Sequence, residues 1–400
     1  MTNADSSTPM PSTPSTTPIL PGATIGMLGG GQLGRMFTIA AKDLGYRVCV
    51  VEPDIHSPAG QLADEHIIAP YDDEAALQQL ANTCDVVTTE FENISAPALQ
   101  WLAEKTLVRP SAEAVEKAQD RIIEKAFIRS CGLLTAPYGA ITTSSEIAIA
   151  VEEVEFPCLL KTARFGYDGK GQVTVHNIEE VREAYAHFNS APCVLEQRID
   201  LEIETSVVLG RNSSGEAQCF PVAENIHIDG ILHKSIVPPR VDETISKAAQ
   251  TAAIRIADKL NYIGVLAVEF FVSKQGELLV NEIAPRTHNS GHYSLDACIT
   301  SQFEQQVRMV CNLPFGDTSL LSPVVMVNML GDLWGDDQPN WHPLLSSATS
   351  KLHLYGKKEA RPGRKMGHYC VLANDVETAN HNADAIFTKL PSITTHSNPS

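Results

Sequence analysis

The sequence predicts a mixed α/β and α+β protein built in three parts. Residues 22–120 open with a strand, a glycine-rich turn and a helix, the usual start of a doubly wound α/β domain. Residues 121–315 alternate strands and helices around a second glycine-rich loop and a hairpin that carries two glutamates. Beyond these, residues 316–400 contain short β-like runs and predict a small β-rich C-terminal domain with a tail.

Composition argues against several classes of protein. The 400 residues carry a formal net charge of −18, which disfavours a general nucleic-acid or anionic-membrane binder. The nine cysteines form no C-x-x-C pair, so we expect reduced thiols and a cytoplasmic location. No apolar run approaches the length of a membrane span. Residues 1–21 are rich in Ser, Thr and Pro and lack Lys and Arg, which predicts a disordered leader.

The first domain contains a glycine loop between an expected strand at residues 24–28 and an expected helix. Gly29-x-Gly31-x-x-Gly34 fits the dinucleotide-binding pattern, and Glu52 lies at the distance along the chain that suits a ribose contact. Taken alone, this pattern indicates an NAD-dependent enzyme. Any phosphate at a helix N-terminus needs similar glycines, however, and Arg35 directly after the loop favours an anion such as a ribose phosphate. A plain tight turn is the third interpretation.

A second glycine-rich loop spans residues 161–172, which read KTARFGYDGKGQ. An apolar strand precedes it and Val173 resumes a strand after it, so we expect a flap between two paired strands. Its glycines allow backbone N–H groups to approach an anion, while Lys161 and Lys170 supply positive charge. A polar surface hairpin is the plain alternative, but the basic residues favour the binding of nucleotide phosphates.

The glutamate hairpin supports that interpretation. Residues 264–272 and 278–283 are strand-like and flank a short turn that contains Gly276. If the turn is a two-residue loop, Glu269 pairs directly with Glu282. Facing like charges are destabilising unless a cation lies between them, and oxygen ligands beside phosphates suit Mg²⁺. The alternative is that one glutamate points to solvent.

Other polar segments give weaker signals. A strand at residues 193–199 could read an adenine at its end, although a solvated strand end is equally consistent with it. His227 is as consistent with a structural hydrogen bond as with a site role. The polar loop at residues 285–292 leaves the carboxylate-bearing strand and therefore favours substrate contact. A basic turn at residues 361–365 could bring several donors to one phosphate.

Together these segments resemble the ATP-grasp ligases, and most closely the 5-(carboxyamino)imidazole ribonucleotide synthetase family of purine biosynthesis. The matching segments are residues 29–36 (GGGQLGRM), 90–93 (EFEN), 161–172, 196–197, 281–292 (NEIAPRTHNSGH) and 361–368 (RPGRKMGH). The resemblance implies a pre-ATP-grasp domain, an ATP-grasp domain with a lid at about residues 138–210, and a C-terminal β domain. A ribonucleotide transformylase or a biotin carboxylase would share the flap and the glutamate pair, but the first and last segments favour the purine carboxylase. A non-catalytic nucleotide sensor could keep every binding residue.

The resemblance also implies roles for individual residues. It places ATP against Arg121, Lys161, Gly166, Tyr167, Asp168, Gly169, Lys170, Gly171, Gln172, Glu196, Gln197, Arg198, Ile199, Glu204, His227, Asn281 and Glu282. It places 5-aminoimidazole ribonucleotide against Gly31, Gln32, Leu33, Arg35, Glu90, Asn289, Ser290, His292, Lys357, Arg361, Arg364 and Lys365. Glu269 and Glu282 would hold Mg²⁺ or Mn²⁺, and the expected catalytic residues are Lys161 and Arg286, with Arg286 holding bicarbonate.

The implied reaction converts ATP, bicarbonate and 5-aminoimidazole ribonucleotide into ADP, phosphate and the carboxyamino product. ATP first phosphorylates bicarbonate to carboxyphosphate, a reactive mixed anhydride that then carboxylates the exocyclic amine. Phosphoryl transfer of this kind depends mainly on positioning and charge neutralisation. We expect neither a nucleic-acid nor a membrane partner, and we expect a homodimer.

Overall fold

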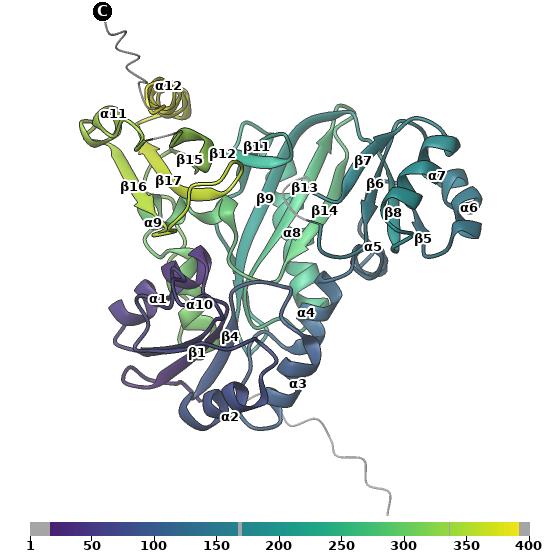
Figure 1. Cartoon of the computed structure of the whole chain (residues 1–400). Helices are drawn as coiled ribbons and strands as arrows, with labels where there is room; N and C mark the ends of the chain where they lie inside the picture. The colour runs from purple at the N-terminus through teal and green to yellow at the C-terminus, as the bar shows by residue number, and fades with distance from the viewer. Residues whose placement is uncertain (1–16, 167–169, 336, 392–400) are drawn as a thin grey trace, which may run out of the picture.

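The computed structural model of the chain describes residues 17–166, 170–335 and 337–391. Figure 1 shows three lobes, with the N-terminal part in purple and blue, a teal lobe on one side and the yellow C-terminal part on the other. The start of the described chain departs from the expected leader, because residues 17–21 pack on the folded domain. The Ile19 N–H donates to the carbonyl of Cys311 at 2.8 Å, and the Tyr46 hydroxyl donates to the Ile19 carbonyl at 2.6 Å. The rest of the expected leader lies outside the described residues.

The N-terminal lobe contains a parallel sheet in the order β3-β2-β1-β4. Its strands are β1 (Thr24–Leu28), β2 (Arg47–Val51), β3 (Glu65–Ile67) and β4 (Val86–Thr89), and its helices are α1 (Gln32–Asp43), α2 (Glu74–Thr83), α3 (Ala96–Ala103) and α4 (Ala112–Ala118). Side chains alternate between the two faces. Ile25 and Met27 of β1 pack with α1, whereas Leu28 packs with α2 and α3. The predicted doubly wound domain is therefore confirmed.

The large sheet joins the other two parts of the chain. Within the described residues its nine strands run β14-β13-β9-β11-β12-β15-β17-β16, and β10 pairs with β9. They are β9 (Leu201–Arg211), β10 (Ala217–Cys219), β11 (Ala223–Ile228), β12 (Ile231–Val237), β13 (Gly264–Ser273), β14 (Leu278–Ala284), β15 (Val324–Leu330), β16 (Ser350–Leu354) and β17 (Lys365–Leu372). Antiparallel pairing of β12 with β15 makes the C-terminal strands a continuation of the central sheet rather than a separate sheet.

Helices cover this sheet and tie it to the N-terminal lobe. They are α5 (Arg121–Ser130), α8 (Glu243–Lys259), α9 (Ser294–Ala297), α10 (Gln302–Val310), α11 (His342–Leu345) and α12 (Val376–Phe387). Phe303 and Val307 of α10 share one buried core with Phe37 of α1, so the two lobes are packed together. The buried Arg109 strengthens this junction, because its guanidinium donates to the Val310 carbonyl at 3.0 Å at the end of α10. The C-terminal helix α12 was not expected from the sequence.

The teal lobe is a small antiparallel sheet in the order β5-β8-β6-β7. Its elements are β5 (Tyr138–Ile141), β6 (Cys158–Thr162), β7 (Gln172–Val175), β8 (Cys193–Gln197), α6 (Ile147–Glu152) and α7 (Ile178–His187). Lys161 pairs with Gln172, so the glycine-rich segment does connect two adjacent strands, as the sequence predicts. None of the helices in the described ranges combines the length and the apolar character needed to cross a membrane.

Candidate active site

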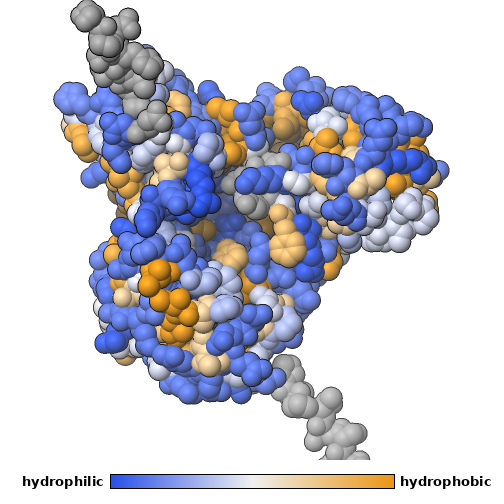
Figure 2. Space-filling view, viewed as in Figure 1, coloured by the Kyte–Doolittle hydropathy of each residue, from blue (hydrophilic) through white to orange (hydrophobic). Residues whose placement is uncertain are grey.

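A cavity of about 1240 Å³ lies between the three lobes, and the space-filling view shows this hollow bordered largely by hydrophilic residues (Figure 2). Its walls come from the β4–α3 segment, the start of α5, the flap strands, the glutamate hairpin and the C-terminal basic turn. Residues that are distant in the sequence thus share one space. The predicted residues that line it are Gln32, Leu33, Glu90, Arg121, Lys161, Gly166, Lys170, Gln172, Glu196, Gln197, Arg198, Ile199, Glu204, His227, Glu269, Asn281, Glu282, Arg286, Asn289, Lys357, Arg361, Arg364 and Lys365.

The hairpin pairs Glu269 with Glu282, as predicted, but by a different route. The turn is one residue longer than expected, because the Ser273 N–H donates to the carbonyl of Glu277 at 2.9 Å. A regular ladder from that turn would misalign the glutamates by one residue. A register shift between Glu269 and Phe270 restores the pairing and leaves Asn281 as the extra residue. This β-bulge turns both Asn281 and Glu282 toward the cavity, whereas a regular strand would send them to opposite faces.

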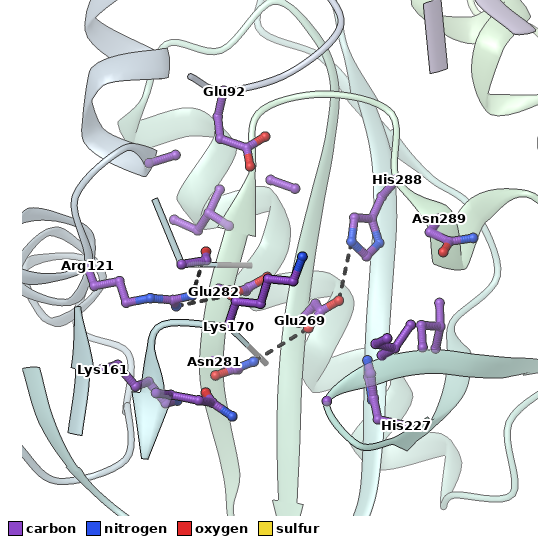
Figure 3. A pocket seen from close by; sticks show the side chains of 18 of the residues that line it. Glu92, Arg121, Lys161, Lys170, His227, Glu269, Asn281, Glu282, His288 and Asn289 are labelled. Carbon is purple, nitrogen blue, oxygen red and sulfur yellow. Dashed lines mark hydrogen bonds and ion pairs between the residues drawn. The ribbon is translucent and has the colours of Figure 1, made fainter. Parts of the chain in front are cut away.

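The paired carboxylates are only partly neutralised by their neighbours (Figure 3). Arg121 Nη1 lies 3.2 Å from a Glu282 oxygen. His288 Nε2 lies 3.4 Å from a Glu269 oxygen, but burial lowers the pKa of His288 well below its ordinary value, so the imidazole supplies no positive charge. Asn281 Nδ2 donates to Glu269 at 3.5 Å. Burial and the charge of Glu282 raise the pKa of Glu269 to about 7. The pair therefore retains repulsion that a cation would relieve.

The phosphate side of the cavity contains a buried trio of charged groups. Lys161 on β6 extends toward Glu196 on β8, with 2.6 Å between Nζ and Oε1. Lys125 on α5 forms an ion pair with the other oxygen of the same carboxylate. Burial would raise the pKa of Glu196, but the two ammonium groups lower it to about 2. Lys125 was not among the site residues expected from the sequence, although its place four residues after Arg121 on one helix face was an available signal.

Arg286 is held by Glu92, a carboxylate that was not among the site residues expected from the sequence. Arg286 Nε lies 2.5 Å from Glu92 Oε2, and Arg286 Nη2 lies 3.3 Å from Glu92 Oε1. Burial would lower the pKa of Arg286, but Glu92 raises it above its ordinary value. The guanidinium is therefore charged and oriented at the cavity wall. Glu92 belongs to the EFEN segment at residues 90–93, which matches the family, but only Glu90 of that segment was expected to contact a substrate.

The glycine loop is occupied by the protein's own carboxylates. Gly30 N–H donates to Glu52 at 2.8 Å, and Gly31 N–H donates to Glu90. A Cβ on Gly30 would lie 2.6 Å from the Cγ and 2.8 Å from the Cβ of Glu52, which explains the need for glycine there. Glu52 also accepts the Tyr71 hydroxyl at 2.6 Å. The dinucleotide interpretation is wrong, because Glu52 has no role as a free ribose ligand and the loop's N–H groups already have acceptors.

Comparisons with known proteins agree with this geometry. Residues 22–119 match a ribonucleotide synthetase preATP-grasp domain, residues 126–303 an ATP-grasp domain, and residues 324–382 a phosphoribosylaminoimidazole carboxylase C-terminal domain. An N5-carboxyaminoimidazole ribonucleotide synthase of Bacillus subtilis strain 168 is 48% identical over 352 residues, covering 88% of this chain and 91% of that protein. The chain belongs to the N5-carboxyaminoimidazole ribonucleotide synthase family.

Solved structures of other family members share the fold. An N5-carboxyaminoimidazole ribonucleotide synthetase in complex with ADP has a TM-score of 0.87 and 46% identity, with 93% of this chain and 98% of that chain covered. A synthase from Aspergillus clavatus, solved with ADP and 5-aminoimidazole ribonucleotide, has a TM-score of 0.84 and 30% identity, with 92% and 98% covered. The protein is an ATP-grasp ligase, as predicted.

Five expected contact residues of this synthase-family protein lie outside the cavity lining. They are Gly31, Arg35, Gly171, Ser290 and His292. Arg35 reaches the Pro58 carbonyl at 3.4 Å, and Gly171 adopts a φ of +72°, so its glycine serves the turn. Three other expected ATP contacts, Tyr167, Asp168 and Gly169, lie outside the described residues.

The NSGH segment supports the site from behind rather than lining it throughout. Ser290 accepts a hydrogen bond from the Ser206 hydroxyl at 2.7 Å, and the His292 ring lies 4.8 Å from that of His368. Only Asn289 of the predicted contacts in this segment reaches the cavity. Both side chains are buried: Ser290 lies against β9, where it bonds Ser206, and His292 lies against His368 of the C-terminal strands, so the structure places them behind the cavity lining.

The buried Glu90 generates a prediction about pH. Burial raises the pKa of Glu90 to about 7, above the ordinary value of about 4.3 that it regains on unfolding. Between these pH values the folded protein keeps a proton that the unfolded chain releases. The free energy of unfolding therefore falls as pH rises through this window. Glu90→Gln removes this titration. We expect the difference in free energy of unfolding between Glu90→Gln and the unchanged protein to grow by about 2–3 kcal/mol from pH 5 to pH 8, in favour of the variant. Urea titrations at both pH values measure this gain.

Glu104→Gln, an exposed position in the same lobe, is the matched control and should show no such gain. A constant difference between Glu90→Gln and the unchanged protein across this pH range would contradict the raised pKa.

Proposed function

We propose that the protein catalyses the ATP- and bicarbonate-dependent carboxylation of the amine of 5-aminoimidazole ribonucleotide in purine biosynthesis. The observation that carries this proposal is that one cavity joins a carboxylate pair and a buried lysine to a distant basic turn. The carboxylate pair and the buried lysine suit a nucleoside triphosphate, and the basic turn suits the phosphate of a ribonucleotide. Family membership and the ligands named for the Aspergillus relative support the same pairing of substrates.

We assign ATP to the side of the cavity formed by the flap strands and β9. Lys161 faces the phosphates, and residues 196–199 offer a strand end whose backbone can read the adenine. His227 Nδ1 lies 2.6 Å from Glu204 Oε2, which orients the imidazole at the same wall. The Glu204 carboxylate suits the hydroxyl groups of a ribose.

Glu269 and Glu282 fit a divalent cation such as Mg²⁺ or Mn²⁺. They are paired, partly buried oxygen ligands, and burial together with the charge of Glu282 raises the pKa of Glu269. No larger group of His, Cys, Asp and Glu side chains suited to a metal occurs in the described ranges, so water and phosphate oxygens would complete the coordination. When bound, the cation would offset negative charge on the phosphates.

Arg286 is our candidate for holding bicarbonate. Glu92 accepts from its Nε and Nη2, and the Thr287 carbonyl accepts from its Nη1, so these contacts orient the guanidinium and bicarbonate would meet the two remaining Nη protons. Lys161 and Arg286 would then neutralise charge on the transferred phosphoryl group and on the bicarbonate that attacks it. The exocyclic amine of the ribonucleotide would attack carboxyphosphate, or the CO₂ released from it, so no nucleophilic serine or cysteine is required.

The charges also orient the ribonucleotide. Lys357, Arg361, Arg364 and Lys365 gather at one wall and suit its phosphate. The Glu90 carboxylate also lines the cavity, and in its ionised form it would repel phosphate and accept N–H or O–H donors. The glycine loop was expected to bind the ribose phosphate. Because Glu90 lies at that loop, we assign the loop instead to the part of the ribonucleotide that carries N–H and O–H donors.

A coupled assay tests the proposal. ADP release should be rapid only when ATP, bicarbonate and 5-aminoimidazole ribonucleotide are all present, and the carboxyamino product should appear in equal amount. ADP release that ignores the ribonucleotide would overturn the assigned acceptor. We also propose a cytoplasmic homodimer, which light scattering of the purified protein and fractionation of the source cells would check.

The carboxylate pair predicts the behaviour of Glu282→Gln. Loss of one charge relieves repulsion with Glu269 but also removes the partner of Arg121, so the melting temperature without ligand should hold or rise slightly. ADP formation should fall by more than about a hundredfold, because a cation ligand is lost. Glu277→Gln in the exposed turn of the same hairpin is the control. Near-normal activity of Glu282→Gln in saturating Mg²⁺ would remove the metal assignment.

The division of the cavity predicts opposite effects for two lysine variants. Lys365→Ala should raise KM for the ribonucleotide by about ten- to a hundredfold and leave KM for ATP nearly unchanged, because one charge-assisted phosphate contact is lost. Lys161→Ala should show the reverse pattern. Lys358→Ala, exposed in the same basic segment, should change neither constant. A rise in KM for ATP alone in Lys365→Ala would assign the basic turn to the nucleotide.

A further inference from the structure

Lys125 is a buried cation that the proposed reaction does not use. Its side chain is 2% exposed, it lies behind the cavity wall rather than in it, and it forms an ion pair with Glu196. Full burial of an ammonium group is costly unless the group is paired, so its position calls for a physical reason. Lys161, which does reach the cavity, forms an ion pair with the second oxygen of the same carboxylate.

The charges of the trio supply that reason. Lys161 and Glu196 alone would form a neutral buried pair, and a lysine neutralised in this way attracts a phosphate weakly. Lys125 adds a second positive charge, so the trio carries a net charge of one positive unit beside the cavity. Lys125 also occupies one carboxylate oxygen, which leaves Lys161 sharing Glu196 instead of being its sole partner.

We infer that Lys125 is a positioning residue that holds Glu196 so that Lys161 presents net positive charge to the phosphates of ATP. This inference rests on the proposed function, because it concerns the ATP side of the same cavity. The surroundings are rigid enough for the role. Glu196 lies on a central strand of the lid sheet, with its side chain 2% exposed, and Lys125 Nζ lies 5.8 Å from the centre of the Tyr138 ring on the adjacent strand.

The ionisation of the trio agrees with this arrangement. Burial opposes the charge on Glu196, but Lys161 and Lys125 together keep its pKa at about 2. Burial lowers the pKa of Lys161, and Glu196 acts in the opposite direction. Glu196 is thus ionised throughout the neutral range and holds both lysines in place.

The first test is Lys125→Met, which keeps the length of the side chain and removes its charge. We expect the Kd for ADP, measured by calorimetry, and KM for ATP to rise by about tenfold or more. KM for the ribonucleotide should stay within about twofold of the unchanged protein. Lys125→Arg, which keeps the charge, should retain most of the ATP affinity. A general loss of folding would instead reduce the fraction of active protein and leave both Michaelis constants of the folded fraction unchanged.

The decisive test is the double variant Lys125→Met with Glu196→Gln. It removes one positive and one negative charge, so the single charge of Lys161 remains and the net charge of the trio is restored. We expect ADP to bind more tightly to the double variant than to Lys125→Met. If Lys125 served packing alone, the effects of the two substitutions on ADP binding would add. The double variant would then bind ADP no better than Lys125→Met.

Arg129→Gln is the matched control. Arg129 lies one turn further along α5 and packs over the same Tyr138 ring at 4.0 Å, but its Nε donates to the Thr135 hydroxyl at 3.2 Å rather than to Glu196. Its ATP constants should be unchanged. An unchanged Kd for ADP in Lys125→Met, or a double variant no better than Lys125→Met, would overturn the inference. If Lys125→Met does not fold, the double variant and Lys125→Arg still decide, because weak ADP binding by both would contradict the charge argument. Failure of the unchanged protein to bind ADP would contradict the proposed function instead.

Discussion

Two carboxylates face each other on β13 and β14, and much of the cavity is arranged around their repulsion. Glu269 and Glu282 lie opposite one another in the ladder, where like charges are unfavourable. Arg121 at the start of α5 and His288 after β14 each approach one of them. Helix, hairpin and loop therefore converge on the same charges. The neutralisation is incomplete, and the remaining negative charge is what would make this point of the cavity selective for a cation carried with phosphates.

The large sheet explains how distant parts of the chain reach that point. Pairing of β12 with β15 carries the C-terminal strands onto the edge of the ATP-grasp strands, and α10 shares its core with the N-terminal lobe. The basic turn before β17 is thereby brought to the same cavity as the flap strands. Packing of this kind fixes the spacing between two binding regions, which a pair of loosely linked domains would not do.

The glycine loop shows how one sequence pattern can serve different physical purposes. In a dinucleotide site the loop's N–H groups bind pyrophosphate. Here Glu52 and Glu90 accept those N–H groups, and the glycines are required because the carboxylates lie so close to the backbone. The pattern indicates that a hydrogen-bond acceptor lies close to the backbone at a helix N-terminus. It does not show whether that acceptor belongs to a ligand or to one of the protein's own side chains.

The sequence by itself determined the three-part α/β organisation, the flap between paired strands and the hairpin that carries both glutamates, because alternation, turn residues and charge are local properties. The exact register that makes the glutamates face each other depended on the bulge. The sequence also identified the family through the order of its short segments. Tertiary structure alone decided the bulge at Asn281, the pairing of Glu92 with Arg286 and the place of Lys125 behind Glu196. Those features join residues from separate elements, and a one-residue irregularity or a buried ion pair depends on packing between elements that no local pattern encodes. The same reason accounts for Ser290 and His292, whose segment looked like a ligand loop: Ser290 is buried against β9 and His292 against His368 of β17.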